Sequence, residues 1–187
     1  AMREALLQGL ALGLGLCLAL YGLAQWRHLG ERLVTTYAIL VIGSTMFSVA
    51  QFGVGRLWLW GDVLWFERHM AGLSALLAAT GSSLFIAEAL RDAGHGRWYR
   101  PTMHAAAGLC VAVGLAFSVD LLPMKVVSAV MSVMGLLPAA LGLPGAWRLM
   151  RRGDPVGRLL LTAWACYLVA TTAMIWLING RLPVNGW

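Results

Sequence analysis

Few side chains in this sequence could take part in catalysis or bind a metal ion, and the histidines are the first to consider. A zinc hydrolase needs about three ligands at one level together with an acid or a base. Of the four histidines, only His69 has acidic residues that we expect at its own depth, Glu67 and Asp120. An interfacial histidine with a structural role explains these residues more simply. We therefore predict no catalytic residue and no metal site.

The remaining histidines do not form the pairs that an intramembrane haem carrier would need, which are ligands from neighbouring helices at matching depth. His28 and His95 lie in connections between apolar segments, and His104 lies at the start of one such segment. The sequence also has no phosphate-binding loop, nucleophile elbow or HExxH pattern. We therefore predict no cofactor, and we expect that this chain is not an enzyme.

Residues 55–68 are the one stretch where aromatic and charged side chains gather. This stretch holds four aromatic, two acidic and two arginine residues. Because tryptophan prefers the headgroup level of a bilayer, the simplest interpretation is an interfacial segment. The functional interpretation is the rim of an outward-facing pocket, with tryptophans as its walls and charges that orient a polar ligand. The candidate ligand-contact residues under that interpretation are Trp58, Trp60, Asp62, Trp65, Glu67 and Arg68.

Long apolar segments must position these residues. Apolar residues make up 60% of the chain and charged residues 12%, whereas a soluble domain is about half apolar and about a quarter charged. A water-soluble fold of this size could not bury that much apolar surface. The expected surroundings are therefore a lipid bilayer. We attribute the net charge of +6 to membrane topology and not to nucleic acid.

The sequence predicts an all-α, polytopic transmembrane helix bundle of six spans with short loops. A span needs about 20 mainly apolar residues, so six spans leave no room for a separate catalytic domain. The expected spans are residues 5–25, 33–54, 70–90, 103–121, 124–150 and 159–178. Pro138 and Pro144 are expected to kink the fifth span. We expect residues 1–187 to form a single transmembrane domain.

Basic residues set the predicted orientation, because cytoplasmic loops carry an excess of lysine and arginine. The connections after the first, third and fifth spans hold nine of the fourteen basic residues. These nine are Arg27, Arg32, Arg91, Arg97, Arg100, Arg148, Arg151, Arg152 and Arg158, and the opposite side holds Arg3, Arg56, Arg68, Lys125 and Arg181. We therefore expect the N-terminus and Trp187 outside the cell and the arginine-rich connections in the cytoplasm.

Ionisable residues are nearly absent from the middle of the expected spans. Glu88 lies near the inner end of the third span, where a pair with Arg91, three residues later, would explain it. Charged residues at membrane depth mark proton relays and ion pathways. Their scarcity argues against a pump or a proton-coupled transporter. The residues by themselves thus indicate a membrane module for sensing or scaffolding.

Short stretches near the ends of the expected spans form a recognisable set. They are residues 20–23, Tyr37, residues 51–53, residues 84–90, residues 151–158 with Leu161 and Trp164 after them, and residues 180–185. Together these stretches resemble the membrane domain of the bacterial seven-transmembrane receptors with diverse intracellular signalling modules. The resemblance extends over nearly the whole chain.

The resemblance implies a multi-pass receptor module in a bacterial inner membrane, which relays an extracytoplasmic signal to a cytoplasmic output of histidine kinase or diguanylate cyclase type. The partners that it implies are the lipid bilayer, a carbohydrate-binding-like extracytoplasmic sensor domain and a cytoplasmic effector domain. A second copy of the chain, in a homodimer, is a further expected partner. Since the flanking modules and a seventh span are not in the sequence, we expect a fragment of a longer receptor with a seventh span beyond Trp187.

Other classes of function remain open at this point. A small-molecule membrane transporter would give uptake in proteoliposomes. A structural subunit of a membrane complex would use the small residues of the spans as contact faces. An intramembrane metal-dependent hydrolase would contain bound metal, which elemental analysis detects.

Overall fold

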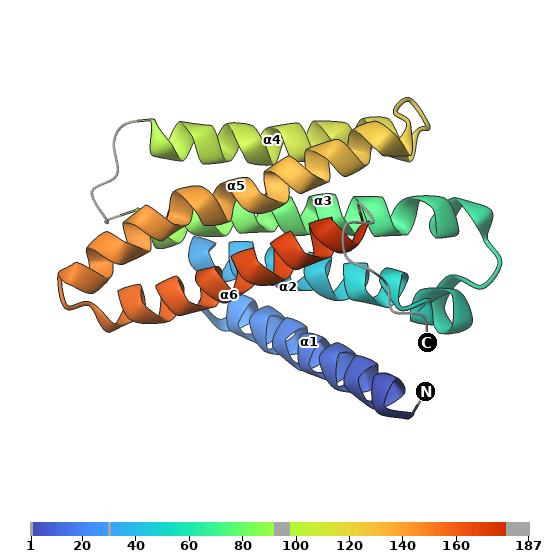
Figure 1. The fold of residues 1–187 in the computed structure, drawn as a ribbon, viewed down its shortest axis with the longest axis horizontal. Helices are drawn as coiled ribbons and strands as arrows, with labels where there is room; N and C mark the ends of the chain where they lie inside the picture. The colour runs from blue at the N-terminus through green and yellow to red at the C-terminus, as the bar shows by residue number, and fades with distance from the viewer. Residues whose placement is uncertain (1, 30, 92–97, 179–187) are drawn as a thin grey trace.

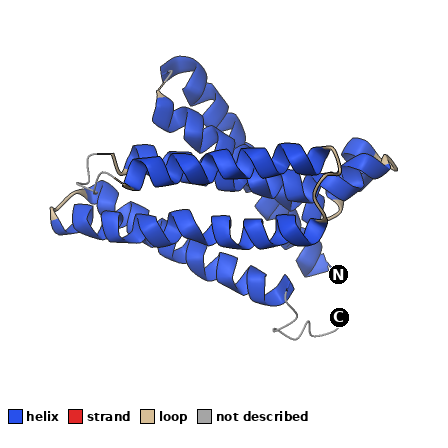
Figure 2. Cartoon of the chain, turned by 90° about the horizontal axis from the view of Figure 1, so that it is seen from above, coloured by secondary structure: helices blue, strands red, loops and turns tan. Residues whose placement is uncertain are grey.

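The computed structural model describes residues 2–29, 31–91 and 98–178, which form six long α-helices and one short π-helical turn. Helices that follow one another in the chain pack side by side in opposite directions (Figure 1). Within the described residues there is no strand, and Figure 2 draws helices and loops there. The elements are α1 (Met2–Leu29), α2 (Arg32–Gln51), η1 (Arg56–Trp60), α3 (Leu64–Ala89), α4 (Tyr99–Ser118), α5 (Met124–Arg151) and α6 (Pro155–Ile178). The predicted all-α fold is confirmed.

Four helices of the described residues are long and apolar enough to cross a membrane, namely α2, α3, α4 and α5. Within α6, the stretch Gly157–Val169 is apolar but shorter. These helices indicate that the chain is a membrane protein. The count of six spans and the single domain remain predictions. Some residues used in the predicted topology and resemblance lie outside the described part of the chain: His95, Arg97, residues 180–185, which include Arg181, and Trp187.

Helix α3 lies at the centre of the bundle, where it packs against α2, α4 and α5. Glycines allow the closest of these contacts. A Cβ atom at Gly81 would overlap the backbone of Leu40 in α2, and a Cβ atom at Gly43 would overlap the backbone of Ala78 in α3. In lipid, where no hydrophobic effect drives helices together, close contact through small residues is the main source of association.

The third helix begins earlier than the sequence predicts. It starts at Leu64 and not at residue 70, so Trp65, Glu67 and Arg68 lie in its first turns instead of a loop. Glu67 suits this place, because a carboxylate interacts favourably with the positive end of the helix dipole. Hydropathy does not detect these turns, because they are aromatic and charged. Helix α5 runs from Met124 to Arg151 without interruption, with Pro138 and Pro144 inside it.

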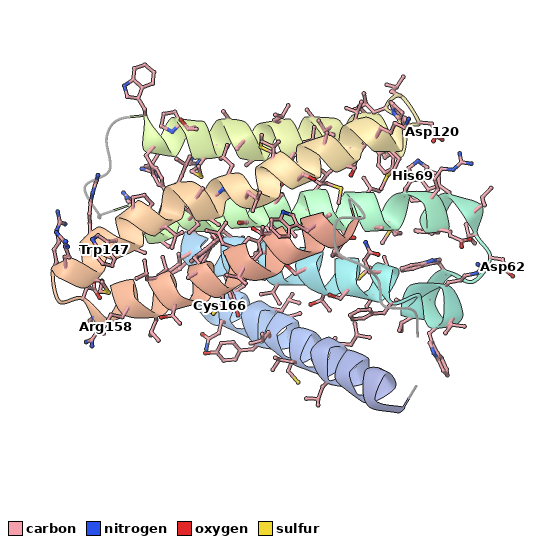
Figure 3. The ribbon with its side chains drawn as sticks, viewed as in Figure 1. Asp62, His69, Asp120, Trp147, Arg158 and Cys166 are labelled. Carbon is pink, nitrogen blue, oxygen red and sulfur yellow. The ribbon has the colours of Figure 1, made fainter. Side chains whose placement is uncertain are left out.

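The two ends of the bundle differ in chemistry. We call one end the tryptophan end, which carries η1, the start of α3 and the connection of residues 119–123 between α4 and α5. The other is the arginine end, which carries the connection of residues 152–154 between α5 and α6. Figure 3 shows Asp62, His69 and Asp120 at the tryptophan end, and Trp147 and Arg158 at the arginine end.

Candidate functional site

At the tryptophan end, one arginine of η1 forms ion pairs with two acidic side chains. Arg56 Nη1 donates to Glu67 Oε1 at 2.9 Å, and Arg56 Nη2 lies 3.5 Å from Asp62 Oδ1. All three side chains are exposed, so each pair contributes less than about 1 kcal/mol. Their effect is positional, since they hold η1 against the first turn of α3. Two of the predicted ligand contacts, Asp62 and Glu67, thus already have a partner.

Glycines shape the connection between α2 and α3. Gly53 and Gly61 have φ angles of +71° and +55°, which residues with a side chain rarely adopt. A Cβ atom at Gly55 would overlap the indole of Trp60, so glycine lets this ring fold back over the connection. Trp60 consequently reaches Phe66 in α3, with ring centroids 6.3 Å apart and planes 21° apart.

A chain of aromatic rings continues from this point to the end of α4. Trp65 meets the ring of Phe66 edge-on at 5.1 Å and stacks on His69 at 4.9 Å, with planes 22° apart. The ring of His69 in turn lies 4.7 Å from that of Phe117 in α4. Aromatic pairs contribute about 0.5–1.5 kcal/mol each beyond the area that they bury. We call Trp60, Phe66, Trp65, His69 and Phe117 the ring chain.

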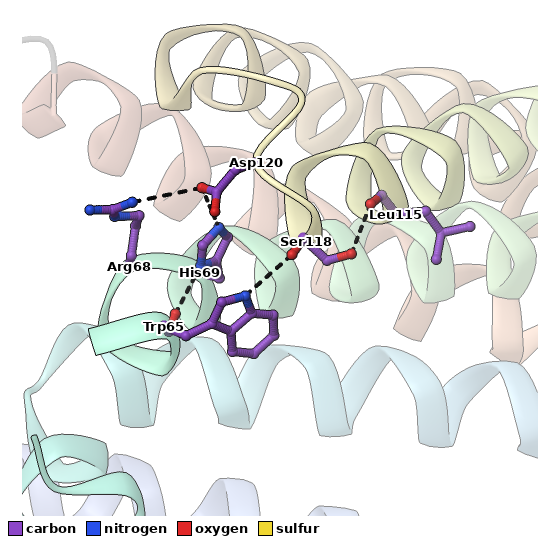
Figure 4. Close-up of polar contacts among 6 residues, drawn as sticks. All are labelled: Trp65, Arg68, His69, Leu115, Ser118 and Asp120. Atoms are coloured by element: carbon purple, nitrogen blue, oxygen red, sulfur yellow. Dashed lines mark hydrogen bonds and ion pairs between the residues drawn. The ribbon is translucent and has the colours of Figure 1, made fainter. Parts of the chain in front are cut away.

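His69 and Phe117 are the buried members of the ring chain, and the side chain of His69 is 1% exposed. Its Nδ1 atom lies 2.9 Å from the backbone oxygen of Trp65, one turn earlier in α3. Its Nε2 atom lies 3.1 Å from Oδ1 of Asp120, in the connection between α4 and α5 (Figure 4). Both ring nitrogens therefore have an oxygen partner, and the second contact joins two elements.

Asp120 occupies the residue after the C-terminal cap of α4. The amide of Leu121 bonds to Ala116 O and the amide of Asp120 to Phe117 O, both at 3.0 Å, which is the Schellman arrangement. That arrangement needs a left-handed residue, and Asp120 has φ of 58°. Glycine usually fills this place, because an L-residue costs about 1–2 kcal/mol there. Asp120 adopts this conformation despite the cost, and its carboxylate contacts the imidazole of His69.

Two further contacts surround this aspartate and histidine. Trp65 Nε1 donates to the backbone oxygen of Ser118 at 3.2 Å, and Arg68 Nη1 lies 3.8 Å from Asp120 Oδ1 (Figure 4). A pocket of about 160 Å³ opens between these groups, lined by Leu64, Trp65, Arg68, His69 and Asp120. The start of α3 is thus fastened to the end of α4 by one indole, one imidazole and one guanidinium group.

The remaining predicted contact residues fall into different surroundings. Trp65 and Arg68 line the pocket, whereas Trp60 reaches it only through the ring chain. Trp58 is 81% exposed, and its neighbours Leu57 and Leu59 are also largely exposed. The six predicted residues therefore lie in two adjoining groups and an exposed apolar tip, and their contact with a ligand stays a prediction.

Sequence reasoning missed the pairing of two residues that organise this site, His69 and Asp120. The sequence suggests them, together with Glu67, as metal ligands or as interfacial residues with a structural role, but Glu67 binds Arg56 instead. In the described part of the chain, no three residues among His, Cys, Asp and Glu gather as a metal site would require. The i,i+4 spacing of Trp65 and His69 could have indicated their stacking on one helix face. No local signal identifies Asp120, because the fold brings it from a distant segment.

The arginine end contains the predicted pair of Glu88 and Arg91, which is confirmed. Glu88 Oε1 lies 3.5 Å from Arg91 Nη1, and its other carboxylate oxygen lies 3.5 Å from Arg100 Nη2 at the start of α4. The guanidinium of Arg151 lies over the ring of Trp147 at 5.4 Å. A single carboxylate thus joins α3 to α4 at this end, as Asp120 does at the other.

Comparison with known proteins gives one match. The model of the family described as 7TM diverse intracellular signalling matches residues 4–187 of this chain. No curated protein and no solved structure matches. The matched range covers nearly the whole chain, so the expected family is confirmed.

Proposed function

This chain belongs to the 7TM diverse intracellular signalling family, and from that membership we propose that it is the transmembrane module of a receptor. In this proposal, the module relays an extracytoplasmic signal to a cytoplasmic output domain of histidine kinase or diguanylate cyclase type. The module itself binds the source of the signal and transmits the signal, and it catalyses no reaction. The observation that carries the relay in this proposal is the continuous ring chain between η1 and the end of α4.

The input surface in this proposal is the exposed tip of η1. Leu57, Trp58 and Leu59 are all largely exposed there. Tryptophan and leucine at the edge of a bilayer suit contact with headgroups or with a folded domain above the membrane. We propose that an extracytoplasmic sensor domain, or a ligand held by it, contacts this tip.

The relay in this proposal is mechanical. A displacement of η1 acts on α3 through Arg56 and through the stack of Trp60 on Phe66. It then reaches the connection between α4 and α5 through Trp65, His69 and Asp120. Packed side chains with two discrete arrangements can carry such coupling. A signal shifts the balance only if it binds the two arrangements with different affinity.

The proposed topology places the tryptophan end outside and the arginine end in the cytoplasm of a bacterial inner membrane. It has six spans in this chain, the N-terminus outside and a seventh span after residue 187 that leads to the effector domain. Four arginines of the described residues support this orientation, since Arg148, Arg151, Arg152 and Arg158 gather at the arginine end. A homodimer of such modules would let two effector domains meet.

Replacement of Trp60 and Trp65 by alanine tests the relay. We expect the output of the full-length receptor, measured as ATP or GTP turnover in membrane vesicles, to fall by at least about fivefold. That is the lower end of the coupling that allosteric proteins show. The double replacement Trp60→Phe with Trp65→Phe retains the ring contacts and should retain most of the output.

The matched control is Trp98→Ala, at the arginine end, where the tryptophan side chain is exposed. It should leave the output unchanged. The amount of each variant in the membrane and its melting temperature show whether the protein has folded. Unchanged output in a folded Trp60→Ala, Trp65→Ala variant would contradict the proposed function.

A further inference from the structure

Both ring nitrogens of His69 face oxygen atoms that accept hydrogen bonds. Nδ1 lies 2.9 Å from the backbone oxygen of Trp65, and Nε2 lies 3.1 Å from Oδ1 of Asp120. A neutral imidazole has one N–H group and one lone pair, and an ionised carboxylate has no proton to donate. A neutral His69 would therefore direct its lone pair at one of these oxygens. Both hydrogen bonds form only if His69 and Asp120 together hold one proton more than a neutral imidazole and an ionised carboxylate do.

We propose that His69 and Asp120 form a proton-binding site, with His69 as an imidazolium that donates from Nδ1 to Trp65 O and from Nε2 to the Asp120 carboxylate. The proton thus acts as a ligand that fastens α3 to the connection between α4 and α5. The site is assembled from two elements and is complete only in the folded chain. Its protonation does not depend on the proposed receptor function, although its use as a signal would.

The surrounding groups favour the proton on the histidine and not on the aspartate. The Asp120 side chain is 61% exposed and lies 3.8 Å from the Arg68 guanidinium, and both conditions favour an ionised carboxylate. The indole of Trp65 stacks on the imidazole with the ring planes 22° apart, and the face of an indole attracts a cation. These contacts oppose the cost of burying a charge at His69.

The other charged groups at this end act elsewhere or oppose the imidazolium. The guanidinium of Arg68, in α3, repels the imidazolium, but it is paired with the same Asp120 carboxylate. Glu67, also in α3, is turned to Arg56 of η1. Lys125, at the start of α5, is exposed. From α4, the group that faces His69 is the ring of Phe117, which carries no charge. Among the described residues, Asp120 is thus the group that can hold the proton on His69.

Loss of the proton should weaken the contact between the two elements. A neutral His69 that still donates to Trp65 would present its lone pair to the Asp120 carboxylate. The carboxylate would then move toward Arg68, and the left-handed connection at Asp120 would lose its support from the buried ring. A rise in pH therefore favours a looser packing at the tryptophan end. If this end is the signal input, protons outside the cell would regulate it.

Nitrogen-15 NMR of the chain, labelled at histidine and held in lipid nanodiscs, tests the proposal directly. At about pH 7.5, an ordinary histidine is mostly neutral. His104 is a matched control, because its Nδ1 also lies 2.8 Å from the carbonyl one turn earlier, Arg100 O, while its ring is exposed. We expect two protonated nitrogens at His69 and one at His104, with His69→Gln used to assign the signal.

Asp120→Asn is the decisive variant. An asparagine amide can donate to Nε2, so a neutral His69 then satisfies both contacts without the additional proton. The signature of the imidazolium should disappear in Asp120→Asn, while the fold, judged from the remaining spectrum, is retained. A neutral His69 in the unmodified chain, or an imidazolium that persists in Asp120→Asn, would overturn the proposal. Neither result affects the tryptophan experiment, which measures the output, so the two proposals fail separately.

Discussion

At the scale of single residues, Asp120 shows how one side chain can serve backbone and site together. It fills a left-handed position that favours glycine, and its carboxylate is the partner of a buried histidine and of Arg68. An observed backbone outlier held by its surroundings is a reason to expect a functional role. The cost of the left-handed φ angle is offset by the contacts of the carboxylate with His69 and Arg68.

The pH dependence of stability is a prediction at this scale. If the folded chain holds a proton between His69 and Asp120 that the unfolded chain releases, then the free energy of unfolding falls as pH rises. We expect the melting temperature in detergent to decrease as the pH is raised. Asp120→Asn should give a flatter profile. An equal decrease in both proteins would assign the effect to other groups.

Residue identity alone shows part of this site. The gathering of tryptophan and charge in residues 55–68 is visible in the sequence, and so is a histidine one turn after Trp65. The sequence does not show which of these side chains pair with one another. Glu67 pairs with Arg56 and not with His69, because η1 brings the guanidinium beside it. Asp120 reaches His69 because α4 ends at the same level of the bundle.

At the scale of elements, close contact between α2 and α3 holds the centre of the bundle. Gly43 and Gly81 each face backbone atoms of the other helix at distances that no side chain would allow. Because α3 also carries the first turns of the site, this contact fixes how deep the site lies relative to α2. Small residues at a helix contact of this kind are a common device in membrane proteins.

Gly81→Ala tests this contact. The added methyl group would overlap the backbone of Leu40, so the helices must separate. We expect a loss of about 1–3 kcal/mol in the free energy of unfolding, as for other overpacked positions. Titration with a denaturing detergent, followed by tryptophan fluorescence, measures it. Gly13→Ala is the control, because nothing lies within 4 Å of its added Cβ atom. Equal stability of both variants would mean that the contact is not essential.

The sequence predicts the elements better than their ends. Apolar segments locate all six long helices, but α3 begins at Leu64 and residues 56–60 form η1. Hydropathy fails there because aromatic and charged residues at a bilayer edge are not a continuous apolar run. Helix α5 also continues through Pro138 and Pro144, since neighbouring helices can satisfy the backbone groups that proline frees.

At the scale of the whole molecule, the two ends divide the chemistry between them. The tryptophan end holds the ring chain, the pocket and the buried histidine. The arginine end holds exposed arginines around the connection between α5 and α6, together with the three-residue network of Glu88, Arg91 and Arg100. The proposed function assigns input to the first end and output to the second, so it depends on which side of the membrane each end faces.

Labelling of single cysteines in intact cells tests this assignment most directly. The three natural cysteines, Cys17, Cys110 and Cys166, are replaced by alanine, and one cysteine is then introduced by Asp62→Cys or by Arg152→Cys, both exposed positions. With a thiol reagent that does not cross the inner membrane, we expect Asp62→Cys to be labelled and Arg152→Cys to be labelled only after the cells are broken. Labelling of Arg152→Cys in intact cells, with Asp62→Cys protected, would contradict the proposed receptor.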